Sequence, residues 1–233
     1  MSAAFETWTV LAHRPIEKLE ENLWRVEGHL PNGRTQRSMI VARMRDGRLL
    51  IHNAIALDEH EMAELEAFGE PAILVVPNGF HRQDARIWKQ RYPSMRVYCP
   101  RGGIKAVAKV VSVDGDLDSM PSDDSVRMAH LVSMKGGEGY LVIRSEARST
   151  LVLNDALLNL PKAGGVMGFL LAPTGRPSVP RVMRWMQMRS RADCTRELSE
   201  LAALPELGRI CVGHGKTLEG DVKSILHDVA ATL

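Results

Sequence analysis

The sequence predicts an α/β fold in a single domain spanning residues 1–233, with strands and helices packed in layers. The central observation is a fully apolar run, PAILVV at 71–76, which is followed by a polar loop, a helix-like segment and another apolar run. This order of strand, loop, helix and strand is typical of a βαβ unit with parallel pairing. Hairpin-like runs precede the unit, strand-like runs follow it, and no internal repeat or low-complexity tract interrupts the chain.

The composition is that of a globular protein with a substantial core. Of the 233 residues, 45% are hydrophobic and 25% are charged. Thirty basic residues oppose 28 acidic ones, so the overall charge indicates no polyanionic partner, and we expect no nucleic acid to bind. The N-terminal residues have neither the basic nor the apolar region of a signal peptide, and no apolar run is long enough to span a membrane.

The cysteines indicate a reducing compartment. Cys99, Cys194 and Cys211 are odd in number and widely spaced, and no CxxC pair occurs. A disulfide framework or a structural zinc knuckle is therefore not expected. Together with the missing export signal, this pattern predicts a cytoplasmic protein.

The first third of the chain predicts antiparallel strands and one helix. The segment 8–30 mixes apolar and polar residues as hairpin strands do, and two further strand-like runs flank the Asp-Gly dipeptide at 46–47, which suits a tight turn with positive φ. Asp58 then has the position of a helix N-cap, with Glu61 three residues later in capping-box spacing. Gly69 ends the predicted helix.

The middle of the chain predicts the βαβ unit itself. The strand at 71–76 is apolar throughout, which is typical of a central strand buried on both faces. The helix is expected over 85–92, with Asp84 as its N-cap and Pro93 as its stop. The next strand is expected over 95–99.

The second half predicts more strands and then three helices. The strands are expected over 109–113, 126–132, 139–145, 149–155 and 209–212, and the helices over 179–191, 195–204 and 221–233. An acidic loop at 114–124 lies among the strands. An EF-hand needs glycine at its sixth position and glutamate at its twelfth, whereas Ser119 and Ser125 stand there, so we expect a solvated surface loop.

The segment 161–180 is rich in glycine and proline, and it matches no nucleotide-binding fingerprint. We interpret it as a mobile loop or cover. The Arg-rich segment 176–196 overlaps it, and its arginines are Arg176, Arg181, Arg184, Arg189, Arg191 and Arg196. We expect a helix whose inner face is formed by Val179, Val182, Met183 and Met186, with solvated arginines outside. Binding of an anionic ligand or a membrane surface is the alternative, and with the charge near zero we expect no membrane partner.

Three segments together carry a resemblance to a known family. The run VVPNGFHRQDARIW at 75–88 leads from a buried strand through a histidine-containing loop into a helix. A later strand ends in LVLNDAL at 151–157, and another runs into VGHG at 212–215. In this order and spacing the chain resembles the metallo-β-lactamase fold superfamily over nearly its whole length, the last two segments being similar to the family's GDAL and PGHG. The resemblance implies a four-layer αββα sandwich, with two mixed β-sheets face to face and helices outside.

The metal-binding signature of that family is only partly present. In the working enzymes, His-x-His-x-Asp-His follows the central strand, and two zinc ions roughly 3.5–4 Å apart share a bridging aspartate and activate a water. No register of the first segment supplies more than one imidazole, that of His81. Lys135 has the position that resembles the family's third histidine. The chain therefore resembles a divergent branch with a degenerate site, in which Asp155 and His214 remain and His81 and Asp84 are candidate helpers.

A carboxylate that has lost its metals needs another partner, or its pKa rises until it is protonated. We therefore hypothesise that Asp155 pairs with a cationic side chain, Lys135 or Arg82, where the zinc would sit. A turn cap at the strand end is the alternative role of Asp155. His214 is either a ligand or an incidental residue of a turn that needs its glycines, and His81 is either a helper or a solvated or helix-capping side chain.

Two functions remain open from the sequence. The first is a non-classical or non-catalytic protein that binds a small molecule in the cleft after loss of the dinuclear site. The alternative is a mononuclear metal-dependent hydrolase of an ester, thioester or phosphodiester, with one zinc or another divalent metal. Its ligands would be Asp155 and His214, with His81 and a weak oxygen ligand from Asn78 as additions, since catalytic zinc usually takes three protein ligands. The fold selects no substrate, and the sequence predicts no oligomeric state.

Overall fold

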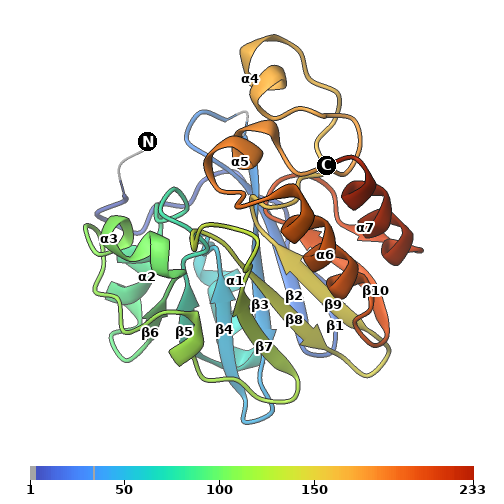
Figure 1. The fold of residues 1–233 in the computed structure, drawn as a ribbon. Helices are drawn as coiled ribbons and strands as arrows, with labels where there is room; N and C mark the ends of the chain where they lie inside the picture. Colours follow the sequence, from blue (N-terminus) through green and yellow to red (C-terminus); the bar gives the residue numbers. More distant parts are fainter. Residues whose placement is uncertain (1–3, 34) are drawn as a thin grey trace.

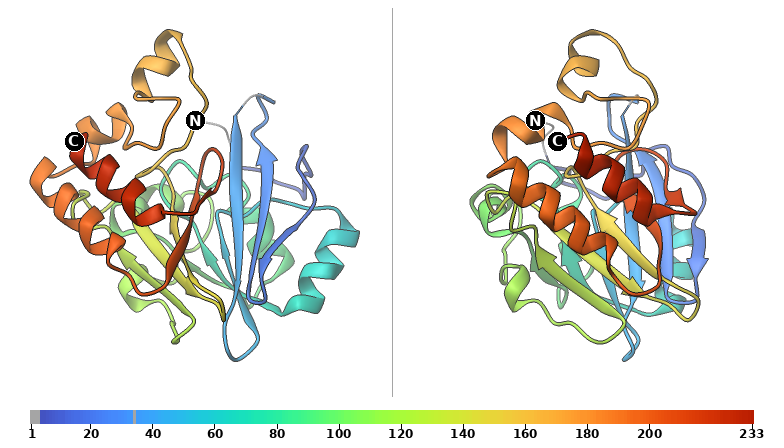
Figure 2. Two further views of the ribbon diagram at one scale, coloured as in Figure 1. Left: turned by 90° about the vertical axis from the view of Figure 1, so that its right-hand side faces the viewer. Right: turned by 45° about the vertical axis from the view of Figure 1, so that its right-hand side comes forward.

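The computed structural model describes residues 4–33 and 35–233, and this part of the chain folds into four layers. Two β-sheets lie face to face, and helices cover both outer faces (Figures 1 and 2). The predicted αββα sandwich is confirmed.

The first sheet is built from the N-terminal half of the chain, with its strands in sequence order. Its strands are β1 (Glu17–Glu20), β2 (Leu23–His29), β3 (Gln36–Arg43), β4 (Arg48–His52), β5 (Glu70–Val75) and β6 (Arg96–Tyr98). The first four pair antiparallel, as successive hairpins do, whereas β4, β5 and β6 pair parallel. The parallel part is the predicted βαβ unit, and it brings the ends of β4, β5 and β6 to one edge of the sheet.

The second sheet has the strand order β11-β10-β9-β8-β7. Its strands are β7 (Val126–His130), β8 (Gly139–Arg144), β9 (Ser149–Leu153), β10 (Leu207–Val212) and β11 (Leu218–Glu219). Only β9 and β10 pair parallel, so both sheets are mixed. The parallel pair brings the residues that follow β9 and β10 to one edge of this sheet.

Most helices cover the outer faces of the sheets, whereas the short helices α4 (Gly165–Leu170) and α5 (Arg181–Met186) lie near one end of the sandwich (Figures 1 and 2). The others are α1 (Glu59–Phe68), α2 (Ala85–Arg91), α3 (Ile104–Val107), α6 (Arg191–Ala202) and α7 (Val222–Ala231). Side chains of α1 and α2 join the apolar core on the outer face of the first sheet, and those of α6 and α7 join the core on the outer face of the second. A third core cluster holds residues of both sheets and therefore lies between them. In all views α4 projects from the body of the molecule (Figures 1 and 2).

The turn and the helix predicted from local sequence signals are present, and the signals act as expected. Gly47 has a φ of 86°, as the tight turn between β3 and β4 requires. The Asp58 side chain accepts a hydrogen bond from the Glu61 backbone N–H at 3.0 Å and caps α1. Gly69 follows the last residue of α1, where it was expected to end the helix.

Two predictions about elements are wrong, and the expected loop or cover over 161–180 includes one short helix. The segment 109–113 forms turns instead of a strand, because its valines pack on the core of the first sheet without a strand partner. The segment 161–180 contains the helix α4. The helix expected over 179–191 covers only 181–186, and none of its residues is buried. Of the predicted inner face, Val179 is buried in the core and Met183 packs against it, whereas Met186 is 54% exposed, so the face is only partly an inner one.

The structure also bears on the cysteines and on membrane-spanning helices. All three cysteines are free thiols in the interior. Among the described residues, no helix combines the length and the apolar character that crossing a membrane requires.

Candidate metal centre

Three side chains that lie far apart in the sequence meet at one edge of the sandwich. His81 lies in the loop after β5, Asp155 two residues after β9, and His214 two residues after β10. All three follow strands that pair parallel with a neighbour, so the two sheets direct these loops into one cleft between them. We call His81, Asp155 and His214 the cluster.

The polar atoms of the cluster converge on one point. The Nε2 atom of His81 lies 3.2 Å from Oδ2 of Asp155, and Nε2 of His214 lies 3.3 Å from Oδ1 of the same carboxylate. The two Nε2 atoms are 3.4 Å apart. One atom from each residue thus lies within 4.8 Å of the others, the arrangement of a group that could hold a metal ion.

The second nitrogen of each imidazole is fixed by a carbonyl oxygen. Nδ1 of His81 lies 3.1 Å from the side-chain oxygen of Asn53, whose own amide nitrogen donates to the Ser38 carbonyl. Nδ1 of His214 lies 2.5 Å from the Gln36 carbonyl. Because these oxygens only accept, each Nδ1 carries the proton. In a neutral imidazole the lone pair of Nε2 therefore points toward Asp155.

Asn53 has the backbone conformation that this contact needs. It follows β4 directly, is 1% exposed and has a φ of 57°, the left-handed region that asparagine tolerates better than most residues. A strained residue at the end of a parallel strand, in contact with the cluster, is typical of a functional site.

Charge in the cluster is reflected in shifted pKa values. Burial would raise the pKa of Asp155, but His81 and His214 hold the pKa of that carboxyl well below its usual range. Burial lowers the pKa of His214, and the hydrogen bond and charge of Asp155 more than offset this, so the pKa is raised. The Asp155 carboxylate therefore stabilises positive charge on the side chains around it.

Behind the carboxylate, Asn78 links Asp155 to a second acidic residue. The Asn78 side-chain nitrogen donates to Oδ2 of Asp155 at 2.8 Å and to Oε1 of Glu138 at 2.7 Å. Its side-chain oxygen accepts from the Phe80 backbone N–H at 2.8 Å. Asn78 therefore presents its nitrogen to the cluster, and not the weak oxygen ligand that we expected.

Glu138, like Asn53, is a site residue that the sequence analysis missed. It is 1% exposed, and burial followed by the charge of Asp155 raises its pKa well above the usual value. Its Oε2 atom is buried without a hydrogen-bond partner among the described residues. The only signal in the sequence is that Glu138 is the one acid in SMKGGEGY, the segment in which we placed Lys135.

The predicted cationic partner of Asp155 is wrong. The Lys135 side chain is exposed, and the Arg82 guanidinium donates to the Ala106 carbonyl. The described hydrogen-bond and ion-pair partners of the Asp155 side chain are Asn78, His81 and His214. The loops after β5 and β10 place the imidazoles of His81 and His214 where we expected an ammonium or guanidinium group.

Asp84, the other candidate helper, lies beneath the cleft and outside the cluster. It has the N-cap position of α2 but makes no side-chain cap hydrogen bond. Instead its Oδ2 lies 2.6 Å from a guanidinium nitrogen of Arg37, both side chains being almost fully buried, and its Oδ1 accepts from the Ala56 backbone N–H. Burial raises the pKa of Asp84, and the Arg37 charge opposes that shift.

The donor set of the cluster fits one divalent metal ion. Two imidazole nitrogens and a carboxylate oxygen are a common ligand set of mononuclear catalytic sites, and their second atoms are held by Asn53, Gln36 and Asn78. Among the described residues, the other group with enough donors is Asp116, Asp118 and His130. There the Arg101 guanidinium already pairs with both carboxylates. The described cleft thus offers ligands for one ion.

A cavity of about 560 Å³ opens above the cluster. His81, Asp155 and His214 line one part of it. Another part, which we call the apolar wall, comes from α4, from the residues that flank it and from α5. The apolar wall consists of Leu160, Met167, Leu171, Val182, Met183 and Met186. Phe80, 62% exposed, lines the cavity from the β5–α2 loop.

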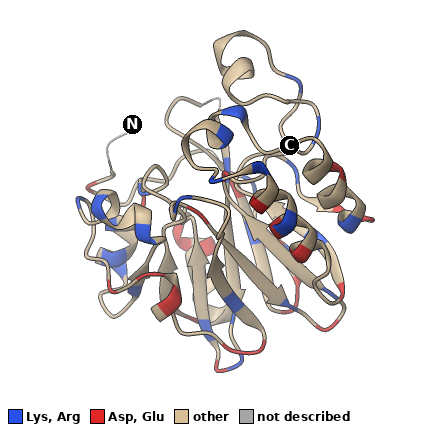
Figure 3. Cartoon of the chain, in the orientation of Figure 1, with Lys and Arg blue, Asp and Glu red and all other residues tan. Residues whose placement is uncertain are grey.

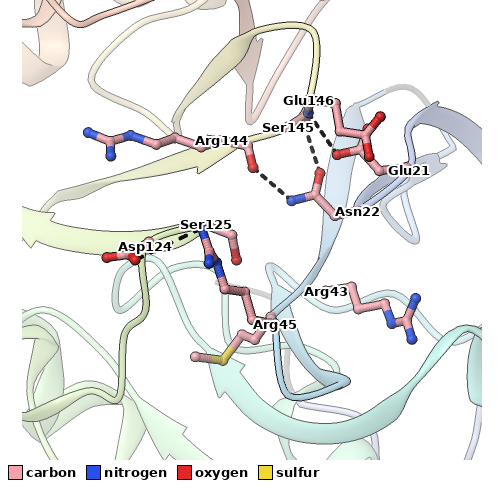
Figure 4. Close-up of a pocket in the computed structure, with 10 residues that line it drawn as sticks. Glu21, Asn22, Arg43, Arg45, Asp124, Ser125, Arg144, Ser145 and Glu146 are labelled. Carbon is pink, nitrogen blue, oxygen red and sulfur yellow. Dashed lines mark hydrogen bonds and ion pairs between the residues drawn. The ribbon is translucent and has the colours of Figure 1, made fainter.

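A second hollow lies at the opposite end of the sandwich, since the turns between β1 and β2, β3 and β4, and β8 and β9 line it. There Asn22 donates to the Arg144 carbonyl at 2.9 Å, accepts from the Ser145 hydroxyl at 2.6 Å, and so joins the two sheets. Charges of both signs line it, including Arg43 and Glu146 (Figure 4). We assign it a structural role.

Solved structures with the same architecture are metallo-β-lactamases. The DIM-1 metallo-β-lactamase exposed to ceftazidime has a TM-score of 0.65 at 16% sequence identity, with 96% of this chain and 99% of that chain covered. TMB-1 has a TM-score of 0.61 at 13% identity, with 93% and 96% covered. VMB-1 at pH 5.5 has a TM-score of 0.62 at 11% identity, with 93% and 96% covered. No protein-family model and no curated protein sequence matches the chain. The chain has the metallo-β-lactamase fold.

Proposed function

We propose that the protein is a mononuclear metal-dependent hydrolase, with one divalent ion held by His81, Asp155 and His214. The convergence of the two Nε2 atoms on the Asp155 carboxylate carries the proposal. Each imidazole donates its Nδ1 proton to a carbonyl oxygen. When both rings are neutral, the lone pairs of the two Nε2 atoms and the negative charge of Asp155 therefore face one another without a proton between them. Such a point needs a cation.

When bound, such an ion acts as a Lewis acid that polarises a carbonyl or phosphoryl oxygen and lowers the pKa of water. The residues of the chain prepare the site. Asn53 and Gln36 fix the two rings, and Asn78 fixes the carboxylate by donating to Oδ2 of Asp155. Second-layer contacts of this kind usually contribute 10- to 100-fold to metal affinity.

A metal-free cleft is the second candidate function, and it corresponds to the largely lost dinuclear site that we first expected. The observation that favours it is the pair of opposite pKa shifts, lowered for Asp155 and raised for His214. In that case a proton on His214 supplies the positive charge, and the cleft binds a small molecule without catalysis. The described residues supply ligands for one ion, which agrees with the loss of a second site in both candidates.

Metal content and activity of the purified protein distinguish the two candidates. We expect inductively coupled plasma analysis to find one divalent ion per chain in protein loaded with zinc or manganese and then desalted. Activity against ester, thioester or phosphodiester substrates is expected to disappear on chelation and to return with metal.

Alanine substitution of each cluster residue tests the assignment of the ligands. His81→Ala, Asp155→Ala and His214→Ala are each expected to lower metal affinity more than 100-fold, since each removes one of three ligands. His60→Ala is the matched control, because His60 is an exposed histidine of α1 outside the cleft. No bound metal in the wild-type protein, or equal loss in His60→Ala, would refute the proposal.

A further inference from the structure

We propose that the substrate is an uncharged carboxylic ester or thioester with an apolar acyl chain, and that this chain lies against the apolar wall. This inference rests on the proposed function, because it names the substrate class of the same site. In the reaction, the carbonyl carbon gains the oxygen of water and its bond to the alcohol oxygen or thiol sulfur breaks. One proton of the water passes to the leaving group, and the products are a carboxylic acid and an alcohol or thiol.

The shape and composition of the cavity support an apolar chain. At about 560 Å³ it lies within the range of pockets that enclose a small molecule, and the cluster lines only part of it. The apolar wall adds three methionines, Met167, Met183 and Met186, whose flexible side chains adapt to varied apolar groups.

The apolar wall extends to the surface of the molecule. Met167 is 61% exposed and Met186 is 54% exposed, yet both line the cavity. The helix α4 carries no charged residue, as Figure 3 shows. A substrate chain that enters from this side would cover apolar surface that is otherwise in water, which favours binding.

The charges around the cavity argue against an anionic substrate. Arg37 is the one lysine or arginine among the described residues that line it. Its guanidinium is 2% exposed, lies 2.6 Å from the Asp84 carboxylate and donates to the Ala54 carbonyl at 3.2 Å. This cation is already neutralised and buried. An anionic group of the substrate that lies away from the proposed metal ion would therefore be desolvated without an opposite charge from this lining.

The arginines closest in sequence to the apolar wall are committed elsewhere. Arg181 stacks on Phe169, with 4.1 Å from its guanidinium carbon to the ring centroid, and donates to the Phe169 carbonyl. Arg184 donates to the Val179 and Thr232 carbonyls. These contacts hold α4, α5 and the C-terminus together, and neither arginine lines the cavity.

A substrate panel tests the class. We would compare p-nitrophenyl acetate, butyrate and octanoate with bis(p-nitrophenyl) phosphate and a chromogenic cephalosporin, which carries a carboxylate, on metal-loaded protein. We expect kcat/KM to rise roughly 10- to 100-fold from acetate to octanoate. Both anionic substrates are expected to react more slowly than the octanoate ester.

Charged substitutions test the apolar wall with matched controls. Met167→Glu and Met186→Glu are expected to remove the preference for octanoate over acetate. Val166→Glu and Trp185→Glu are the controls, since Val166 and Trp185 are 76% and 60% exposed neighbours that do not line the cavity. The controls are expected to keep the preference within about twofold.

Binding to the metal-free protein gives a readout that does not depend on catalysis. We expect the neutral fluorescent probe N-phenyl-1-naphthylamine to bind at one saturable site and to be displaced by methyl octanoate. Met167→Glu with Met186→Glu is expected to weaken its binding at least roughly tenfold, and the two controls to leave it unchanged.

The outcomes separate this inference from the proposed function. Metal-dependent cleavage of the phosphodiester or cephalosporin in preference to the octanoate ester would overturn the inference while the metal centre stands. Absence of all metal-dependent activity would overturn the proposed function and, with it, the assignment of an ester substrate. Probe binding that the two wall substitutions do not weaken would overturn the inference whatever the activity.

Discussion

The two sides of the cleft differ in how strongly the fold fixes them. On one side, the cluster with Asn53, Asn78 and Glu138, which we call the polar floor, is buried or half-buried and joined by hydrogen bonds. On the other side, the apolar wall is carried largely by α4 and α5. No residue of α5 is buried, and α4 projects from the body of the molecule (Figure 1).

This difference indicates a division of roles. A metal centre needs donor atoms held within fractions of an ångström, and the polar floor supplies such restraint from the ends of four strands. Recognition of an apolar group needs surface and adaptability, which exposed methionines provide. The polar floor thus determines the chemistry, and the apolar wall determines the substrate.

The largest expected effect comes from the ion pair beneath the polar floor. Asp84→Ala leaves the Arg37 guanidinium buried without its partner, and we expect this to destabilise the fold by about 3–5 kcal/mol in urea unfolding. Glu64→Ala removes an exposed ion pair with Lys18 and is expected to cost less than about 1 kcal/mol. Replacing Asp84 and Arg37 together with leucine and methionine should recover most of the loss. Equal effects of Asp84→Ala and Glu64→Ala would show that the polar floor has no such support.

Glu138 provides the next test, because its pKa is raised well above the ordinary value by burial and by the charge of Asp155. Glutamine keeps a side-chain oxygen that accepts from Asn78 and carries no charge at this buried position. We therefore expect Glu138→Gln to change metal affinity less than about threefold. Glu138→Ala removes the acceptor of Asn78 and is expected to weaken metal binding 10- to 100-fold, as isothermal titration would measure. A larger loss in Glu138→Gln than in Glu138→Ala would contradict the role of Glu138 as an acceptor for Asn78.

His52 makes the stability of the fold depend on pH, whereas the apolar wall contains no titratable residue. Burial, followed by the charge of His81, lowers the pKa of His52 to about 3. As the pH falls through the ordinary histidine pKa of about 6.5, the unfolded chain takes up a proton that the folded chain refuses, so the fold loses stability. Between pH 7 and pH 5 this loss is about 2 kcal/mol, and it continues toward pH 3.

The measurement is the difference in unfolding free energy between pH 7 and pH 5. We expect that difference to be smaller by about 2 kcal/mol in His52→Gln than in the wild-type protein. The exposed His227, replaced in the same way, is the control. An unchanged pH dependence in His52→Gln would mean that His52 titrates normally in the folded protein.

The smallest effect on stability is expected at the apolar wall itself. Met186→Ala removes a side chain that is 54% exposed, and it should change the unfolding free energy by less than about 0.5 kcal/mol. Leu153→Ala, at the end of β9 beside the polar floor, removes a side chain that is 1% exposed and should cost about 2–5 kcal/mol. A loss of several kcal/mol in Met186→Ala would show that the apolar wall is part of the core.

The sequence predicted the polar floor better than the apolar wall, for physical reasons. The strand at 71–76, the capped helix at 59–68 and the turn at 46–47 are set by local signals, and the structure confirms them. The segments LVLNDAL and VGHG were placed correctly at strand ends because β9 and β10 are apolar runs with clear stops. Fold and element order were therefore accessible from sequence.

Two features of the polar floor were not accessible. The sequence analysis compared residues 75–88 with the family's linear histidine signature, but residues 78–84 form successive turns, in which His81 donates its backbone N–H to the Asn78 carbonyl. The turns bring His81 to Asp155, with Nε2 at 3.2 Å from Oδ2. Glu138, and not Lys135, faces inward, where its carboxyl accepts a hydrogen bond from the Asn78 amide that also donates to Asp155.

The apolar wall was misjudged because its pattern resembles that of a core. Apolar residues at helical spacing over 179–186 predict an inner face, but α5 packs beside a cavity and leaves Trp185 and Met186 in water. Periodicity shows that a face is apolar, and it does not show whether protein or ligand covers that face.

The central claim, one metal ion at the cluster, is tested most directly by anomalous scattering. Crystals grown with zinc and measured at the zinc edge are predicted to show a single strong peak between Nε2 of His81, the Asp155 carboxylate and Nε2 of His214. Crystals of Asp155→Ala are predicted to lack it. Two peaks in the cleft, or none in the wild-type protein at saturating zinc, would contradict the account.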